Sequence, residues 1–258
     1  MEKIVPHESF YAKIKGLKKI SSICLYISAL ISFFILIVGK FNFCLNATFN
    51  EALIIKLLNA LLAFFSVSYF VLDVFLNDLF LKAELNRKKG LIDNSLNSRL
   101  SDKQSQGYFS NDTISFGLYK FGVNSFENSF FSKKISERMI NKMIFKSSLI
   151  LVLFLLVVFF TENEIITVIA KISLPFTIIH QTVRLLIYNK HIAAVFERYK
   201  DIFSNTDKSE LNALLLDNVL NQEMTNAWAR TSLDSNLYTE MNSDLSLEWE
   251  EIKKERDL

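Results

Sequence analysis

Three cationic side chains recur at helical spacing near the middle of the chain and could bind a phosphate-rich ligand. Lys134, Arg138 and Lys142 are four residues apart within a predicted amphipathic helix over 125–146, so they lie on one face of it. Cations neutralise phosphate charge, and aromatic rings close by in the sequence could stack on bases. The pattern therefore predicts a nucleotide or oligonucleotide site. The side chains predicted to bind this ligand are Lys120, Lys133, Lys134, Arg138, Tyr108 and Tyr119.

A second interpretation of the same cations needs no soluble ligand. Lysine and arginine beside a membrane span mark its cytosolic end and pair with anionic lipid headgroups, while the phenylalanines around them pack the domain. Composition alone favours this interpretation, and the sequence leaves both open.

Lys171 is the most informative charge in a predicted apolar helix over 165–187. A charge within hydrocarbon costs at least ~2.5 kcal/mol, so such a residue normally faces a bundle interior or water. The polar residues of this helix fall within about half of its surface, which suits the wall of a pore built from several copies of the chain. A closed four-helix bundle in which Lys171 pairs with Asp73 or Glu164 explains the pattern equally well. The predicted pore-lining residues are Thr167, Lys171, Thr177, Gln181 and Arg184.

The sequence offers little material for metal, redox or enzyme chemistry. It has three histidines and two cysteines, and Cys24 and Cys44 lie near the start and just beyond the end of the first apolar segment. If that segment spans a bilayer, the two thiols are too far apart for a disulfide. The usual phosphate-loop, dinucleotide, serine-hydrolase and zinc-protease motifs are missing, and six glycines leave little scope for a phosphate-cradling loop. We therefore expect no metal, no cofactor and no enzyme activity.

Four apolar segments must position these residues, and each has the length of a membrane-spanning helix. The segment 20–38 carries no charge and, at ~1.5 Å per residue, is long enough for the ~30 Å hydrocarbon core. It is too long for the apolar part of a signal peptide and lacks a cleavage site. Further apolar segments cover 52–72, 143–160 and 165–187. The sequence therefore predicts an all-α integral membrane protein with four transmembrane helices in two hairpins.

Positive charges near the membrane ends orient these helices. Four lysines precede the first segment and twelve lysines and arginines lie in 82–146, whereas the loops on the other side hold only Lys40 and several glutamates. Both termini and the insert are therefore predicted to be cytosolic. The predicted domains are the N-terminal segment with the first hairpin (1–81), the cytosolic helical insert (82–146), the second hairpin (147–187) and the acidic helical tail (188–258).

The insert and the tail are both predicted to be helical. We expect the helix after residue 72 to leave the bilayer and to continue as far as Gly90, and helix to resume after Gly122 and run into the third span. Residues 188–258 carry 14 acidic and 8 basic residues, opposite in balance to the rest, so we expect them to form a separate unit with a solvated acidic group around Trp249. The predicted tail helices cover 190–203, 208–220 and 244–256.

Two short motifs in the insert and the four-helix architecture resemble a bacterial defence family. The motifs are Gly107-Tyr108-Phe109-Ser110-Asn111 and Glu127-Asn128-Ser129-Phe130-Phe131, and the likeness extends over residues 10–200. The family comprises four-transmembrane effectors linked to nucleotidyltransferases in anti-phage defence, of the CBASS S-4TM kind and the membrane effector of the Hailong system. The resemblance implies a homo-oligomeric, gated ion channel in the bacterial inner membrane. A nucleotide or oligonucleotide signal from a partner nucleotidyltransferase would control it, and the open pore would depolarise the membrane and halt growth in an abortive infection.

A protein of another class fits the same features. A non-conducting membrane scaffold or immunity protein could recruit a soluble partner through its acidic tail. Its signature would be a dry bundle with Lys171 in a salt bridge.

Overall fold

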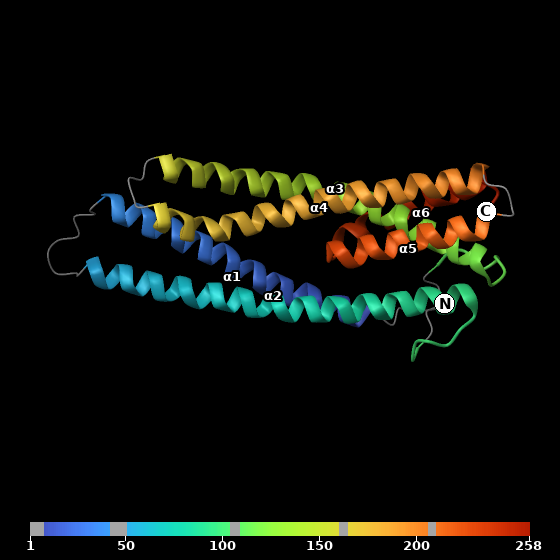
Figure 1. Ribbon diagram of the computed structural model, residues 1–258, viewed down its shortest axis with the longest axis horizontal. Helices are drawn as coiled ribbons and strands as arrows, with labels where there is room; N and C mark the ends of the chain where they lie inside the picture. The colour runs from blue at the N-terminus through green and yellow to red at the C-terminus, as the bar shows by residue number, and fades with distance from the viewer. Residues whose placement is uncertain (1–7, 42–50, 104–108, 160–164, 206–209) are drawn as a thin grey trace. The chain divides into compact units, whose positions relative to one another are not determined.

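The computed structural model describes residues 8–41, 51–103, 109–159, 165–205 and 210–258, and these residues form helices and connecting segments without a strand (Figure 1). Within the helices, the side chains of residues 36–41, 51–52, 153–154, 156–159, 165–175 and 205 lie outside the described part. The expected all-α class is confirmed. The helices are α1 (Glu8–Phe41), α2 (Glu51–Leu96), α3 (Leu118–Phe159), α4 (Ile165–Asn205), α5 (Leu211–Ala229) and α6 (Ser235–Glu255).

The first four helices are long and continue where the sequence changes from apolar to charged. They contain 34, 46, 42 and 41 residues. As expected, α3 joins the amphipathic stretch of the insert to the third apolar segment. The fourth apolar segment and the first predicted tail helix are a single helix, α4, because no helix-breaking residue separates them near 188. The predicted domain boundary at residue 188 therefore falls inside a helix.

The expectation that Gly90 ends the second helix is wrong. A glycine inside a helix costs only ~1 kcal/mol, and α2 passes through Gly90 to Leu96. The end is set instead by Asn97, which adopts a left-handed backbone (φ 55°). The Asp93 carboxylate then holds the departing chain by accepting hydrogen bonds from the Leu100 and Ser101 backbone amides at 2.7 and 2.8 Å.

Gly122 does not mark the beginning of a helix either. Helix α3 begins four residues earlier, at Leu118, directly after Gly117, whose φ is 154°. A Cβ atom at Gly122 would lie only 2.6 Å from a methyl carbon of Leu215 on α5. The glycine therefore allows the close approach of α3 to the Leu215 side chain of α5 and does not form a turn.

Helices α5 and α6 are longer than the predicted tail helices. Helix α5 ends at Ala229, and Arg230 follows it with a left-handed backbone (φ 47°). Helix α6 begins after Asp234, whose side chain accepts a hydrogen bond from the Asn236 backbone amide at 2.9 Å, the usual arrangement of a helix N-cap.

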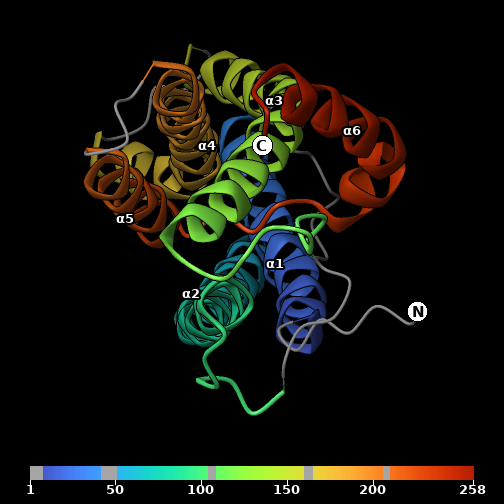
Figure 2. The same ribbon diagram turned by 90° about the vertical axis from the view of Figure 1, so that its right-hand side faces the viewer.

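The described chain divides into two compact units, of which the first joins the insert to the tail. Unit 1 comprises Met1–Ala12, Leu79–Asn141 and Arg184–Leu258. The structure thus differs from the expectation of a separate acidic tail, because tail side chains complete the apolar core of the insert. In Figure 2 the N-terminal part of α3 lies between α5 and α6. The centre of the core is aromatic: Phe126 packs against Phe196, Tyr199, Phe203 and Trp249, with ring centroids 5.1 to 5.5 Å apart.

Unit 2 comprises Lys13–Asp78 and Lys142–Val183 and carries the apolar segments. Among the described residues, α1 over Glu8–Ile35 and α2 over Leu53–Leu96 are long and apolar enough to cross a membrane. The most apolar stretch of α2 leaves large side chains exposed, including Phe64, Phe70 and Phe75 at 62 to 66% exposure. Such a surface is unusual for a protein that faces only water.

Candidate functional site

The two adjacent lysines predicted to bind ligand point toward different helices. Lys133 on α3 lies 3.4 Å from Glu197 on α4, and its ammonium group lies 4.8 Å from the centre of the Phe196 ring. Lys134 pairs with Glu248 on α6 at 2.6 Å. Both lysines therefore pair with acidic groups of the tail, and Glu248 is both paired and partly solvated, with 43% of its side chain exposed.

Lys120 and Tyr119, two further predicted ligand-binding residues, have apolar surroundings and partners of their own. Lys120 is buried with its ammonium group 4.8 Å from the centre of the Phe116 ring. Tyr119 is half-buried, edge-on to Phe203 at 5.7 Å, and burial raises the pKa of its hydroxyl. Arg138 is exposed, and Tyr108 lies outside the described residues.

The residues predicted to line a pore fall in both units. In unit 2, the Gln181 amide on α4 donates to the Tyr69 hydroxyl on α2 at 3.3 Å, and Thr177 is half-buried. Arg184 is half-buried and belongs to unit 1. The side chains of Thr167 and Lys171 lie outside the described part, so the expected pairing of Lys171 does as well. A further polar contact in this unit joins Ser147 on α3 to Thr182 on α4 at 2.5 Å.

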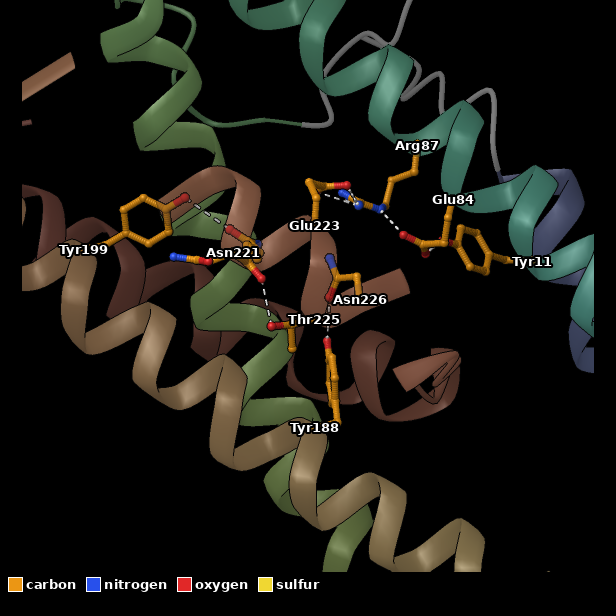
Figure 3. A network of polar contacts seen from close by, with 10 residues as sticks. Tyr11, Glu84, Arg87, Tyr188, Tyr199, Asn221, Glu223, Thr225 and Asn226 are labelled. Atoms are coloured by element: carbon orange, nitrogen blue, oxygen red, sulfur yellow. Dashed lines mark hydrogen bonds and ion pairs between the residues drawn. The ribbon is translucent and has the colours of Figure 1, made fainter. Parts of the chain in front are cut away.

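A buried ion-pair network joins three helices of unit 1 (Figure 3). The Arg87 guanidinium on α2 donates to Glu84 one turn earlier at 2.9 Å and to both carboxylate oxygens of Glu223 on α5 at 2.7 and 2.6 Å. The Tyr11 hydroxyl on α1 donates to Glu84. The side chains of Arg87, Glu84 and Glu223 are only 12, 16 and 18% exposed. We call these four residues the Arg87 network.

Further polar contacts, separate from the Arg87 network, join α4 to α5 (Figure 3). The buried Tyr188 hydroxyl on α4 donates to Asn226 on α5 at 3.2 Å, and burial raises the pKa of Tyr188 to about 12. The Tyr199 hydroxyl donates to Gln222 at 3.3 Å. Helix α5 is thus attached by hydrogen bonds to α2 on one side and to α4 on another.

A second buried polar group lies around Glu127 of α3. Its carboxylate accepts hydrogen bonds from the Asn111 amide at 2.7 Å and from the Ser110 hydroxyl at 3.2 Å. The same Asn111 amide donates to Asn124 at 3.0 Å, and the Trp249 indole of α6 donates to the Ser110 hydroxyl at 3.1 Å. We call Ser110, Asn111, Asn124 and Glu127 the Glu127 cluster. It anchors the segment that precedes α3 to both α3 and α6.

The Glu127 carboxyl group titrates near neutral pH. Burial raises its pKa from 4.5 to about 7, although hydrogen bonds from Ser110 and Asn111 and the charge of Lys253 on α6 act in the opposite direction. The charge inside unit 1 therefore changes close to pH 7.

Sequence reasoning missed the Arg87 network and the role of Glu127. Arg87 and Glu223 are 136 residues apart, and no local pattern links them. Glu127 had one signal, because it belongs to one of the two motifs that carry the family resemblance, and Ser110 and Asn111 belong to the other. The structure brings these motifs together in the Glu127 cluster.

Comparisons with protein-family models, with curated proteins and with solved structures found no match to this chain. Its function is therefore argued from its own residues and geometry.

Proposed function

We propose that the protein is a homo-oligomeric membrane effector whose cytosolic domain, unit 1, gates an ion-conducting pore built by four transmembrane helices. One observation carries this proposal. The helices α2, α3 and α4 each continue without a break from the apolar unit 2 into unit 1. In this proposal a change in a helix of unit 1 reaches an apolar segment along the same helix.

The signal in this proposal is a nucleotide or oligonucleotide made by a partner nucleotidyltransferase, as the family resemblance implies. The partly exposed ion pairs Lys133–Glu197 and Lys134–Glu248 support a place for it on unit 1. Pairs of this kind contribute only ~0.2–1 kcal/mol, and a polyanion that offers several phosphates could form charge-assisted hydrogen bonds with both lysines at once. A polyanionic ligand that takes the lysines from both glutamates would loosen α4 and α6 from α3 and bias the helices toward a second arrangement.

The ligand proposal is tested by binding of short oligonucleotides and cyclic nucleotides to the full chain in detergent. Lys134→Glu together with Arg138→Glu should abolish binding and leave membrane insertion intact. Glu248→Gln is the matched control, because it also breaks the Lys134 ion pair but keeps the cation, and it should retain or strengthen binding. Normal affinity in the double variant would mean that these cations do not bind the ligand and would favour their interaction with lipid headgroups.

The pore proposal is tested by membrane potential and dye entry in bacterial cells that express the protein with and without its neighbouring genes. We expect depolarisation that a nucleotidyltransferase switches on or off, and Lys171→Leu should change conductance or ion selectivity. Unchanged single-channel currents in that variant would remove Lys171 from the pore wall. An intact potential under every condition would refute the channel.

The non-conducting scaffold is the second candidate, and the packing of the tail limits the surface that it could offer. Glu223, Glu248 and Asp217 of the tail pair with Arg87, Lys134 and Arg198. A soluble partner would therefore have to bind exposed acidic residues of α6, such as Glu240 and Asp244.

A further inference from the structure

Helix α5 carries a row of large apolar side chains that nothing in the described chain covers. One face of the helix is buried through Leu215 and Val219 in the core of unit 1. In Figure 2 the helix lies at the edge of this unit, with α6 on the other side of α3. The exposed row has a spacing of four residues: Leu216, Leu220, Met224 and Trp228 are 42, 54, 70 and 55% exposed.

The charges of α5 argue against a lipid surface as the occupant of this row. Single exposed apolar side chains are common, but a continuous row on one helix indicates a docking surface. Helices that lie on anionic membranes carry lysine and arginine beside their apolar face. The sequence of α5 contains neither, and its two charged residues are Asp217 and Glu223. A protein surface is therefore the better fit.

Three members of the row, Leu216, Leu220 and Met224, are symmetric about Leu220, which suits contact with an identical helix, whereas Trp228 would lie opposite Asn212 of the partner subunit. At ~3.6 residues per turn, Leu216 and Met224 lie about 40° to either side of Leu220, at equal distances along the helix. The small, exposed Ala213 and Ala227 lie seven residues to either side of Leu220. We propose that α5 packs antiparallel against α5 of a second copy of this chain, about a twofold axis at Leu220.

The antiparallel register produces matched layers along the contact. Leu220 meets Leu220 of the partner subunit at the axis, and Leu216 meets Met224 of the partner subunit. Two alanines then meet at each end, which lets the helices approach closely. A twofold contact requires such self-complementarity, and a parallel pair would instead place the two bulky Trp228 rings side by side.

The charges at the ends of α5 favour the same direction. Glu210 is exposed at the start of the helix and Arg230 is exposed just after its end. In an antiparallel pair each end of the contact combines an acidic residue with a basic one, whereas a parallel pair groups like charges. The helix dipoles are also opposed in this arrangement.

Disulfide cross-linking of the full chain tests the contact, with Cys24 and Cys44 replaced by alanine. Leu220→Cys should form a covalent dimer under mild oxidation. Leu247→Cys is the matched control, because this leucine is 66% exposed on α6 and belongs to no apolar row. Equal cross-linking at the two positions would show random collision and overturn the proposal.

Direction is tested by mixing two single-cysteine chains. Leu216→Cys and Met224→Cys should cross-link to each other several-fold more than either does to itself. Self cross-linking at both positions without mixed dimers would show a parallel pair and refute the proposed register.

A substitution at the proposed twofold axis measures how much the α5 contact contributes to association of the two copies. Leu220→Asp removes one buried leucine from each copy, which should weaken association roughly a hundredfold in a fluorescence-transfer assay between labelled chains in mild detergent. Leu247→Asp should leave association unchanged. Quenching of Trp228 by brominated lipid in vesicles, combined with unaltered association of Leu220→Asp, would show that lipid covers this face and would overturn the proposal.

This contact does not depend on ion conduction. Loss of cross-linking with intact depolarisation would refute the α5 contact alone, and cross-linking without depolarisation would refute the channel alone.

Discussion

Glu127 makes the stability of unit 1 depend on pH, and Glu127→Gln should remove that dependence. Below about pH 4.5 the carboxyl is protonated in both the folded and the unfolded chain. Between pH 4.5 and about 7 the unfolded chain loses this proton and the folded chain keeps it. Stability conferred by the protonated group is therefore fully present below pH 4.5 and is lost as pH rises through about 7.

The size of the effect follows from the pKa difference. Each unit of pKa difference corresponds to ~1.36 kcal/mol, so raising the pKa from 4.5 to about 7 costs the folded state about 3 kcal/mol above pH 7. For a chain of this length, ~1 kcal/mol changes the melting temperature by about 2–4 °C. The wild-type protein should therefore melt roughly 6–12 °C lower at pH 8 than at pH 4.5 through this group alone.

The assay is thermal unfolding of the full chain in an uncharged detergent, followed by far-ultraviolet circular dichroism from pH 4.5 to 8. Glutamine keeps an oxygen that can accept from Asn111 and a group that can bond to Ser110, so the variant should fold. Glu137→Gln is the matched control, because Glu137 is exposed on the same helix. Any other contribution to the pH dependence of stability is the same in the wild type, Glu127→Gln and Glu137→Gln, so it cancels when their melting temperatures are compared.

Two results would refute this reasoning. An equal loss of stability with rising pH in the wild type and in Glu127→Gln would assign the dependence to other groups. A variant less stable by the same amount at every pH would show that Glu127 is ionised throughout and paired with Lys253.

Two further predictions concern packing and charge in unit 1, and thermal unfolding measures both. Gly122→Ala should destabilise the protein by ~1–3 kcal/mol, because its Cβ would clash with the buried Leu215, whereas Gly90→Ala has open space within 4 Å and should stabilise it by ~0.5–1 kcal/mol. A stabilised Gly122→Ala would show that Leu215 moves aside without cost. Arg87→Met should cost ~3–5 kcal/mol, because two buried glutamates lose their cation, and Glu223→Gln, which leaves the Glu84 ion pair intact, should cost less. Equal costs for the last two variants would show that the Glu84 ion pair adds no stability once Glu223 is neutral.

The secondary structure was largely predictable, because it depends on local patterns. Long apolar segments and helical spacing of charges identified an all-α chain and placed α3 as a helix that enters an apolar segment. The errors concern glycines. The sequence pattern favours breaks at Gly90 and Gly122, but isolated glycines are tolerated in helices, and Gly122 packs against Leu215.

The candidate site was much less predictable, because it depends on residues far apart in the sequence. The sequence supplied the cations of α3, but not their pairing with Glu197 and Glu248 of the tail. The net charge of residues 188–258 suggested a solvated, separate tail, whereas the apolar positions of α5 and α6 decided its place in the core. Net charge describes solubility and partners rather than packing.

The sequence by itself determined that this chain is helical and that its apolar segments have the length of a membrane span, because propensity and hydropathy act over a few neighbouring residues. Only the tertiary structure decided which charges are buried and which surfaces stay open. Arg87 becomes part of a network only when Glu223, 136 residues away, reaches it, and Glu127 titrates near pH 7 only once the core closes around it. These properties arise from desolvation and proximity, which no single segment contains.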